Sequence, residues 1–236
     1  MGWTFPYFYP IIALTLRKSK DHTMKQILFD LDGTITDSGE GIIHCAQETF
    51  AHFGLAVPTK EELRVIVGPP LRRSLLQFGI HPEDIEDAVE VYRQHYVEHG
   101  QYENFPYPGM EGLLQRLKKE GHQLYVATSK PEAMSVQILS YFGLTQYFDR
   151  ICGSTADQSR DTKAKVIAHL LAQVSPIPGR IIMVGDTVYD VEGANALQIP
   201  CIGVGWGYGV PEDMMAEGAV GIAHSMEELY HLISQF

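Results

Sequence analysis

The stretch ILFDLDGTITD, residues 27–37, places two carboxylates where a buried strand should end. Apolar residues lead into Asp30, and Asp32 follows two positions later. Side chains at this spacing in a strand lie on the same face, so the two carboxylates should be neighbours in space. Carboxylates held together repel each other unless a cation compensates them. The pair therefore indicates a site that holds a cation and uses two acidic groups.

Polar side chains also follow the later apolar segments of the chain. They are Thr128, Ser129, Lys163, Asp186 and Asp190. An open parallel sheet binds ligands at the carboxyl ends of its strands. We therefore expect these side chains to converge with Asp30 and Asp32 on one edge of a sheet.

This set of residue types suits the transfer of a phosphoryl group. Hard oxygen ligands with partly open coordination suit Mg²⁺. A carboxylate beside Mg²⁺ can attack phosphorus, and a second carboxylic acid can protonate the leaving oxygen and then activate water. A hydroxyl, an ammonium group and N–H groups at a helix start can hold the phosphoryl oxygens.

The order of the predicted elements shows what positions these side chains. From about residue 107 onward, short apolar segments alternate with amphipathic helical ones. This alternation predicts an α/β fold with a doubly wound parallel sheet. Residues 38–106 instead suggest consecutive helices, one of them starting with a capping box at Thr59 and Glu62. We predict a core of residues 24–37 and 107–236 with residues 38–106 inserted as a helical cap.

Taken together, the motifs resemble the haloacid dehalogenase (HAD)-like hydrolase superfamily. The resemblance covers residues 24–236 and is carried by DLDGTITD, VATSK, Lys163 and GDTVYD. The segments VGPPLRRSL and GVGWGYGVPEDMMAEGA are similar to the phosphoglycolate phosphatase-like branch. The resemblance implies a HAD-like Rossmannoid core, and it implies that the inserted helices form a mobile cap.

The resemblance also implies a role for each matching position. Asp30 would be the nucleophile that becomes an aspartyl-phosphate, and Asp32 the general acid and base. Mg²⁺ would be bound by Asp30, the main-chain carbonyl of Asp32 and Asp186, with Asp190 supporting them. The residues implied to bind the phosphate are Gly33, Thr34, Thr128, Ser129 and Lys163.

The chain departs from the branch at two of these positions. Ser129 stands where the branch often has Asn, and Lys163 lacks the proline that usually follows it. Lys165 therefore remains a rival for the phosphate-site lysine. Thr128 and Ser129 also fit ordinary helix caps, and Asp190 fits a simple helix N-terminus.

The function we expect is a Mg²⁺-dependent phosphatase that hydrolyses a small phosphomonoester, with phosphoglycolate as the leading substrate by resemblance. A 5′-nucleotidase, a pyrophosphatase or a sugar-phosphate mutase of the same superfamily remains an alternative. A catalytically silent, phosphate-binding regulatory protein is the alternative outside enzymes. The fold alone does not decide between these substrates.

Composition limits the partners. The chain has 236 residues and a net charge of −11, which argues against a nucleic-acid partner. Its three cysteines are widely spaced, which favours a reducing, cytoplasmic location. The ten histidines suggest no ligand set, and Arg72 and Arg73 fit a solvated surface better than a substrate site. Nothing in the composition indicates an oligomeric state.

Residues 1–23 differ from the rest of the chain. An aromatic and apolar run with Pro6 and Pro10 is followed by a charged segment, and Met24 then leads directly into the first predicted strand. The run is too short to predict stable membrane insertion, and it lacks the features of a signal peptide. We expect a disordered or misassigned extension, with a membrane-surface anchor as the alternative.

Overall fold

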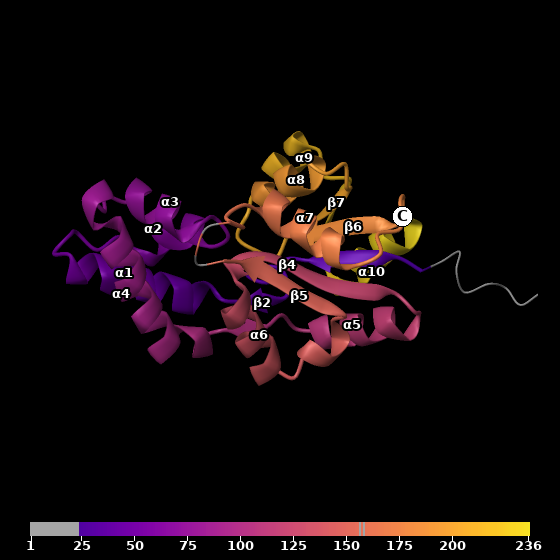
Figure 1. Ribbon diagram of the computed structural model, residues 1–236, viewed down its shortest axis with the longest axis horizontal. Coiled ribbons are helices and arrows are strands. Elements are labelled where there is room, and N and C mark those ends of the chain that lie inside the picture. The colour runs from indigo at the N-terminus through magenta and orange to yellow at the C-terminus, as the bar shows by residue number, and fades with distance from the viewer. Residues whose placement is uncertain (1–23, 156, 158) are drawn as a thin grey trace, which may run out of the picture.

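The computed structural model describes residues 24–155, 157 and 159–236 (Figure 1). The predicted extension, residues 1–23, lies outside the described residues. A six-stranded sheet has the order β5-β4-β1-β6-β7-β8, and all its neighbouring strands are parallel. The strands are β1 (Gln26–Phe29), β4 (Gln123–Pro131), β5 (Arg150–Ser154), β6 (Ile181–Gly185), β7 (Cys201–Val204) and β8 (Gly221–Ala223). This architecture confirms the predicted doubly wound α/β core.

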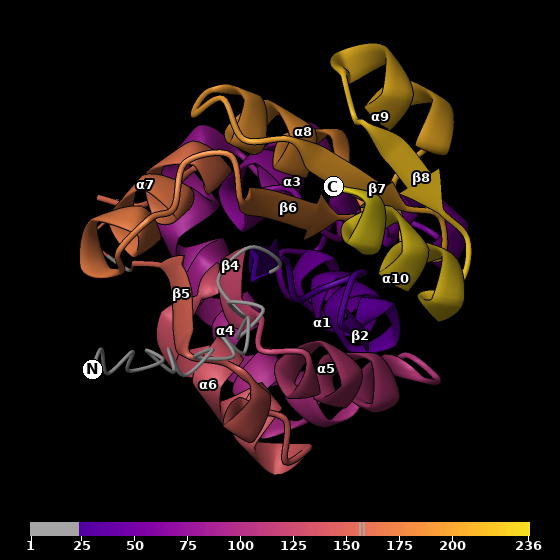
Figure 2. The ribbon, with the colours of Figure 1, turned by 90° about the vertical axis from the view of Figure 1, so that its right-hand side faces the viewer.

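Helices cover both faces of the sheet (Figure 2). They are α5 (Met110–Lys119), α6 (Glu132–Tyr141), α7 (Lys163–Gln173), α8 (Val188–Asn195), α9 (Pro211–Glu217) and α10 (Met226–Gln235). Along β1, Ile27 and Phe29 pack in a cluster with residues of α5, α6 and α10, whereas Leu28 packs with residues of α7, α8 and α9. Because both faces are buried, the strand reads as a continuous apolar run.

A helical unit stands beside the carboxyl ends of the strands (Figure 1). It contains α1 (Gly39–His52), α2 (Lys60–Leu63), η2 (Arg64–Ile66), α3 (Leu71–Gln77), η3 (Pro82–Asp84), α4 (Ile85–Glu98) and η4 (Gly100–Tyr102). Most of its buried side chains, including Phe50, Leu63 and Leu75, form one hydrophobic cluster, which Ile138 of α6 joins from the core. The predicted capping box is confirmed, since the Glu62 N–H donates to the Thr59 hydroxyl at 3.2 Å.

One short ribbon carries the chain into the helical unit and back out. Strands β2 (Thr36–Asp37) and β3 (Phe105–Pro106) pair antiparallel, with Asp37 opposite Phe105. The two crossings between sheet and helices are therefore side by side. The segment between them is close to the predicted cap, residues 38–106.

Two further findings concern the environment of the chain. Within residues 24–236, apart from the two undescribed positions, no helix is long and apolar enough to span a bilayer. Cys45, Cys152 and Cys201 are all buried, and none forms a disulfide.

Candidate active site

Lys163 joins two of the predicted acidic residues at the carboxyl edge of the sheet. It is the first residue of α7, and its Nζ lies 2.7 Å from Asp30 Oδ1 and 2.7 Å from Asp190 Oδ1. The same ammonium donates to the main-chain oxygen of Ala127 at 3.1 Å. All three charged side chains are buried, so the ammonium and the carboxylates interact with little screening by water.

Asp30, Asp186 and Asp190 form a compact carboxylate cluster. Each offers an oxygen within 4.8 Å of the others, and all three residues are buried. Burial raises the pKa of Asp30 to about 6, against the lowering effect of Lys163. The pKa of Asp186 is raised well above its usual range by burial and by the charges of Asp190 and Asp30. The three carboxylates are therefore held together at an electrostatic cost, and the residues could hold a divalent cation.

The same carboxylate cluster shifts the pKa of Lys163. Burial acts to lower its pKa, but the carboxylates of Asp190 and Asp30 outweigh this effect and raise it above the usual value. The lysine is therefore charged at neutral pH. One ammonium group thus faces three carboxylates.

The carboxylates of Asp186 and Asp190 differ in the groups that donate hydrogen bonds to them. Asp190 accepts hydrogen bonds from the N–H and the hydroxyl of Thr187 at 3.0 and 2.9 Å, which fixes it at the start of α8. Asp186 accepts from the Thr34 hydroxyl at 3.2 Å and from the Tyr208 N–H at 2.8 Å. Both oxygens of Asp190 are engaged, Oδ2 by Thr187 and Oδ1 by Lys163, whereas Lys163 contacts Asp30 at Oδ1, so Asp30 and Asp186 are better placed to bind a cation. The sequence had suggested only a supporting role for Asp190.

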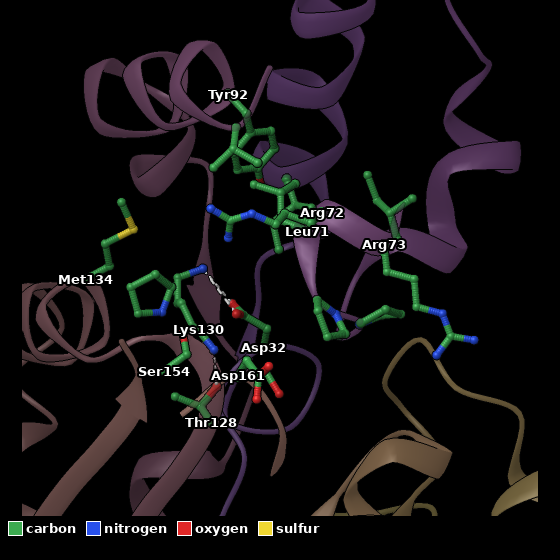
Figure 3. Close-up of a pocket in the computed structure, with 18 of the residues that line it drawn as sticks. Asp32, Leu71, Arg72, Arg73, Tyr92, Thr128, Lys130, Met134, Ser154 and Asp161 are labelled. Carbon is green, nitrogen blue, oxygen red and sulfur yellow. Dashed lines mark hydrogen bonds and ion pairs between the residues drawn. The ribbon is translucent and has the colours of Figure 1, made fainter. Parts of the chain in front are cut away.

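The Asp32 carboxylate pairs outside that cluster, with Lys130. Lys130 Nζ lies 3.1 Å from both of its oxygens (Figure 3). The ammonium also lies 4.3 Å from the ring centroid of Tyr96, which belongs to α4 of the helical unit. Lys130 is a site residue to which the sequence analysis assigned no role. The available signal was its place directly after Thr128 and Ser129 at a strand end.

Two of the predicted phosphate-binding residues, Thr128 and Ser129, line the pocket together with Asp30. The Thr128 hydroxyl accepts from the Lys130 N–H at 3.2 Å and also hydrogen bonds to Asp30. Thr128 and Ser129 belong to β4 and do not cap a helix. Ser129 is half-buried and faces the pocket.

The rival lysine lies elsewhere. Lys165 is exposed, and its Nζ pairs with Asp161 at 2.7 Å. Of the two lysines, Lys163 is the one in contact with Asp30.

A pocket of about 390 Å³ separates the sheet edge from the helical unit. Asp30, Asp32 and Thr128 line it from the core, while Tyr92 and Tyr96 line it from α4. Residues of both the core and the helical unit therefore form the wall of the pocket. Figure 3 shows the side chains of both parts pointing toward this space.

Arg72 and Arg73, which the sequence suggested as solvated surface, differ in burial, since Arg72 is half-buried and Arg73 is exposed. Both line this pocket (Figure 3). Arg72 is half-buried, and its Nε donates to Glu86 at 2.7 Å, whereas Arg73 lies over the ring of Tyr189 at 5.4 Å. The sequence predicted consecutive helices in this region, but it does not show that their helix, α3, faces the core.

The glycine-rich loop after β7 wraps around Asp186 and so borders the site. A Cβ on Gly207 would lie 2.3 Å from Asp186 Cβ, and a Cβ on Gly209 would lie 2.0 Å from the Asp186 main-chain oxygen. Only glycine allows this approach. The loop can therefore bring the Tyr208 N–H onto the Asp186 carboxylate.

Gly33→Ala should destabilise the protein more than Gly54→Ala. Both glycines have positive φ, at +81° and +66°, so alanine costs roughly 1–2 kcal/mol of backbone strain at either position. A Cβ on Gly33 would also lie 2.1 Å from Asp186 Oδ2, whereas one on Gly54 meets no atom within 4 Å. The measurement is the free energy of unfolding in urea. Equal losses in the two variants would contradict the close approach of Gly33 to Asp186.

Residues 27–204 match the family model of haloacid dehalogenase-like hydrolases. The chain belongs to this family. A solved structure described as a predicted phosphatase from Clostridium acetobutylicum has 39% sequence identity and a TM-score of 0.87, covering 90% of this chain and 99% of that one.

Named relatives have several activities. The tyrosine-protein kinase PtkA of Mycobacterium tuberculosis is 41% identical over 205 residues, 86% of this chain and 70% of that protein. A 5′-nucleotidase of Pseudomonas aeruginosa is 38% identical over 80% of this chain and 86% of its own length. A phosphoglycolate phosphatase of Agrobacterium fabrum is 34% identical over 77% and 80%. The family and its phosphatase relatives identify this HAD hydrolase as an enzyme that acts on phosphomonoesters.

Proposed function

We propose that the protein is a Mg²⁺-dependent phosphatase that hydrolyses a small phosphomonoester through an aspartyl-phosphate on Asp30. One observation carries the proposal. Asp30 and Asp32 line the same pocket, yet Asp30 pairs with Lys163 and Asp32 with Lys130. Two carboxylates with different partners can take the different roles that this reaction needs.

The donor set fits Mg²⁺. Asp30 and Asp186 offer hard carboxylate oxygens, and the cluster holds more negative charge than Lys163 can offset. These two residues would hold the ion, with the main-chain carbonyl of Asp32 as a further proposed ligand. When bound, Mg²⁺ would neutralise charge on the phosphoryl group and on the nucleophile.

The chain's own groups account for the remaining chemistry. Lys163 and the Leu31 N–H both bind Asp30 Oδ1, each at 2.7 Å, which leaves Oδ2 as the better nucleophile. Attack by Oδ2 would form a bond to phosphorus while the bond to the leaving oxygen breaks. Asp32 would give that oxygen a proton, and would then take one from the water that hydrolyses the aspartyl-phosphate. Lys163 and Thr128 would hold the phosphoryl oxygens.

The helical unit would act as the cap, residues 38–106, over the core of residues 24–37 and 107–236. Its α3 and α4 supply one wall of the pocket, and Tyr96 touches Lys130. Closure of such a wall excludes water from the reacting phosphoryl group, and opening releases products. Swapping pocket residues of the unit should therefore change substrate preference more than the chemical step.

Phosphoglycolate is the first candidate substrate, by resemblance. A nucleoside monophosphate is the second, and the pocket favours it. Its volume of about 390 Å³ suits a ligand larger than a two-carbon acid, and its wall combines Tyr92 and Tyr96 with Arg93. The 5′-nucleotidase relative supports the same choice. The kinase relative adds transfer from ATP to a tyrosyl acceptor as a reaction to be tested.

The test is phosphate release from a panel of phosphorylated metabolites, with Mg²⁺ and with chelator. The panel holds phosphoglycolate, nucleoside monophosphates, pyrophosphate, sugar phosphates, and ATP with a tyrosine peptide. Mg²⁺-dependent release from one monoester far above the rest supports the proposal and names the substrate. Transfer to sugar or peptide without release of phosphate would replace it with a mutase or a kinase. Binding without any turnover would leave a regulatory protein.

Asp32→Asn should lower kcat by roughly 10²–10⁴-fold, because an amide cannot exchange a proton with the leaving oxygen or with water. The affinity for Mg²⁺ should stay the same, since the proposed ligand there is the main-chain carbonyl. Steady-state kinetics and a Mg²⁺ titration measure both. The matched control is Asp213→Asn, an exposed carboxylate on α9 that does not line the pocket. A normal kcat in Asp32→Asn would remove its acid–base role.

A cytoplasmic location and the absence of a nucleic-acid partner remain predictions. The first rests on the three buried cysteines without a disulfide, and the second on the net charge of −11.

A further inference from the structure

Several histidines meet at the base of the helical unit. His44 and Glu48 lie on α1, and His95 lies near the end of α4 with His99 as its C-cap. Together with Glu103, these residues are called the cap-base cluster below. The sequence suggested no ligand set among the histidines, but His95 and His99 are four positions apart and His44 packs beside His99.

The rings of His44 and His99 lie between two glutamates. Their centroids are 5.0 Å apart. His44 Nδ1 is 3.1 Å from Glu103 Oε1, and His99 Nδ1 is 3.9 Å from the same oxygen. On the other side, His44 Nε2 is 3.8 Å from Glu48 Oε1, and His99 Nε2 is 2.9 Å from Glu48 Oε2. Each imidazole therefore presents Nδ1 to Glu103 and Nε2 to Glu48.

One of these nitrogens is buried without a partner. Among the residues that the structure describes, His99 Nδ1 is inaccessible to solvent and forms no hydrogen bond. A buried polar atom without a partner costs roughly 1–3 kcal/mol. A group bound between Nδ1 of His99, Nδ1 of His44 and Glu103 would satisfy it.

We propose that His44, His99 and Glu103 bind a divalent transition-metal ion of the Zn²⁺ type, with Glu48 orienting the two imidazoles from behind. Nitrogen and carboxylate donors together suit Zn²⁺ and its neighbours more than Mg²⁺. The ligand atoms already lie within 4.8 Å of one another. Ligands at ~2.0–2.2 Å from a tetrahedral Zn²⁺ lie ~3.3–3.6 Å apart, so only small side-chain adjustments are needed.

Glu48 completes the arrangement. A metal-bound histidine commonly donates its other ring N–H to a carboxylate, which fixes its tautomer. Glu48 lies near Nε2 of both proposed ligands, and His95 Nδ1 approaches it at 3.4 Å. Cys45 Sγ groups with Glu48 and His99 and not with the set of His44, His99 and Glu103, so it is not counted as a ligand here.

The ion has access to this site, and the site joins both ends of the helical unit. The His44 side chain is 44% exposed and Glu103 33%, which leaves room for a fourth ligand from solvent. Glu103 stands just before the exit strand β3, and its main-chain oxygen accepts from the Gly41 N–H at 3.3 Å near the entry. A bound ion would therefore link the entering and leaving segments of the chain.

The test is calorimetric titration of the full chain with Zn²⁺ in excess Mg²⁺. We expect His99→Gln and Glu103→Gln each to lower the Zn²⁺ affinity by about tenfold or more. His231→Gln is the matched control, because His231 Nε2 makes a similar 3.2 Å contact with Glu227 on an exposed helix, and no third ligand converges there among the residues that the structure describes. This variant should bind Zn²⁺ like the wild type.

A second variant separates this site from the carboxylates of the active site. Asp186→Asn removes a carboxylate that could also take Zn²⁺, and it should leave binding at the cap-base cluster unchanged. Circular dichroism confirms the fold of each variant, and Glu103→Gln is the most conservative of them. Loss of all Zn²⁺ binding in Asp186→Asn, or equal affinity in the wild type, His99→Gln and Glu103→Gln, would overturn the proposal. The cluster would then be a set of ion pairs alone.

Discussion

Asp30→Asn is expected to lower phosphate release by roughly 10⁴-fold or more while the protein stays folded. The amide has the shape of the carboxylate and fits the same buried position, but it cannot attack phosphorus. Steady-state release of phosphate from the best substrate of the panel measures the loss. Asp213→Asn, on the exposed surface of α9 and outside the pocket, should keep its activity. Turnover retained in Asp30→Asn would end the assignment of Asp30 as the nucleophile.

Although Asp30→Asn lowers activity, it should increase the stability of the protein at neutral pH when metal is absent. The pKa of Asp30 is about 6 in the folded protein, above its usual 3.8, so the folded state binds more protons between these values. The contribution of Asp30 to stability therefore decreases as the pH rises from about 4 to about 6. In chelator, Asp30→Asn should lose this part of the pH dependence and be more stable than the wild type at pH 7. Urea unfolding across this pH range measures the difference, and identical pH profiles would contradict it.

Lys163→Met is expected to lower both activity and stability. Its removal leaves the buried carboxylates of Asp30 and Asp190 without their cation, which costs about 3–5 kcal/mol for a broken buried ion pair. It also removes a donor to the phosphoryl oxygens, which should lower kcat by roughly 10²-fold or more. Unfolding in urea and steady-state kinetics give the two values.

Lys165→Met is the control for this prediction. Its ion pair with Asp161 is exposed, so the loss in stability should stay below about 1 kcal/mol and activity should be normal. The two lysines are rivals in sequence, and this pair of variants decides between them. An inactive Lys165→Met beside an active Lys163→Met would reverse the assignment.

The core of the fold could be predicted because its signals are local. Continuous apolar runs such as residues 27–29 and 181–184 reveal strands that are buried on both faces. Strand β8 and helix α9 were not predicted. Gly221–Ala223 is only three residues long, and α9 begins directly after a glycine-rich loop. The two-residue strands β2 and β3 were also missed, because their pairing depends on partners far apart in the sequence.

In the candidate site, too, local signals in the sequence were predictive and long-range contacts were not. Asp30, Asp186 and Lys163 stand at strand or helix ends, where the sequence pattern led to them. The contact of Lys130 with Asp32 was not predictable, since it depends on how the end of β4 turns toward β1. Tyr208 was missed for a similar reason: its hydroxyl accepts a hydrogen bond from the Gly39 N–H at 2.7 Å, across much of the chain.

The ribbon of β2 and β3 has a consequence for how the chain folds. Gln26 and Gln123 are neighbours in the sheet, although they are 97 positions apart, and closing so long a loop is entropically costly. The helical unit has its own hydrophobic cluster, and its two ends meet where Asp37 pairs with Phe105. If this unit folds early, it brings the ends of the long loop together before the sheet forms. The effective contact order of the central strand pair is then much lower than the sequence separation suggests, which speeds folding.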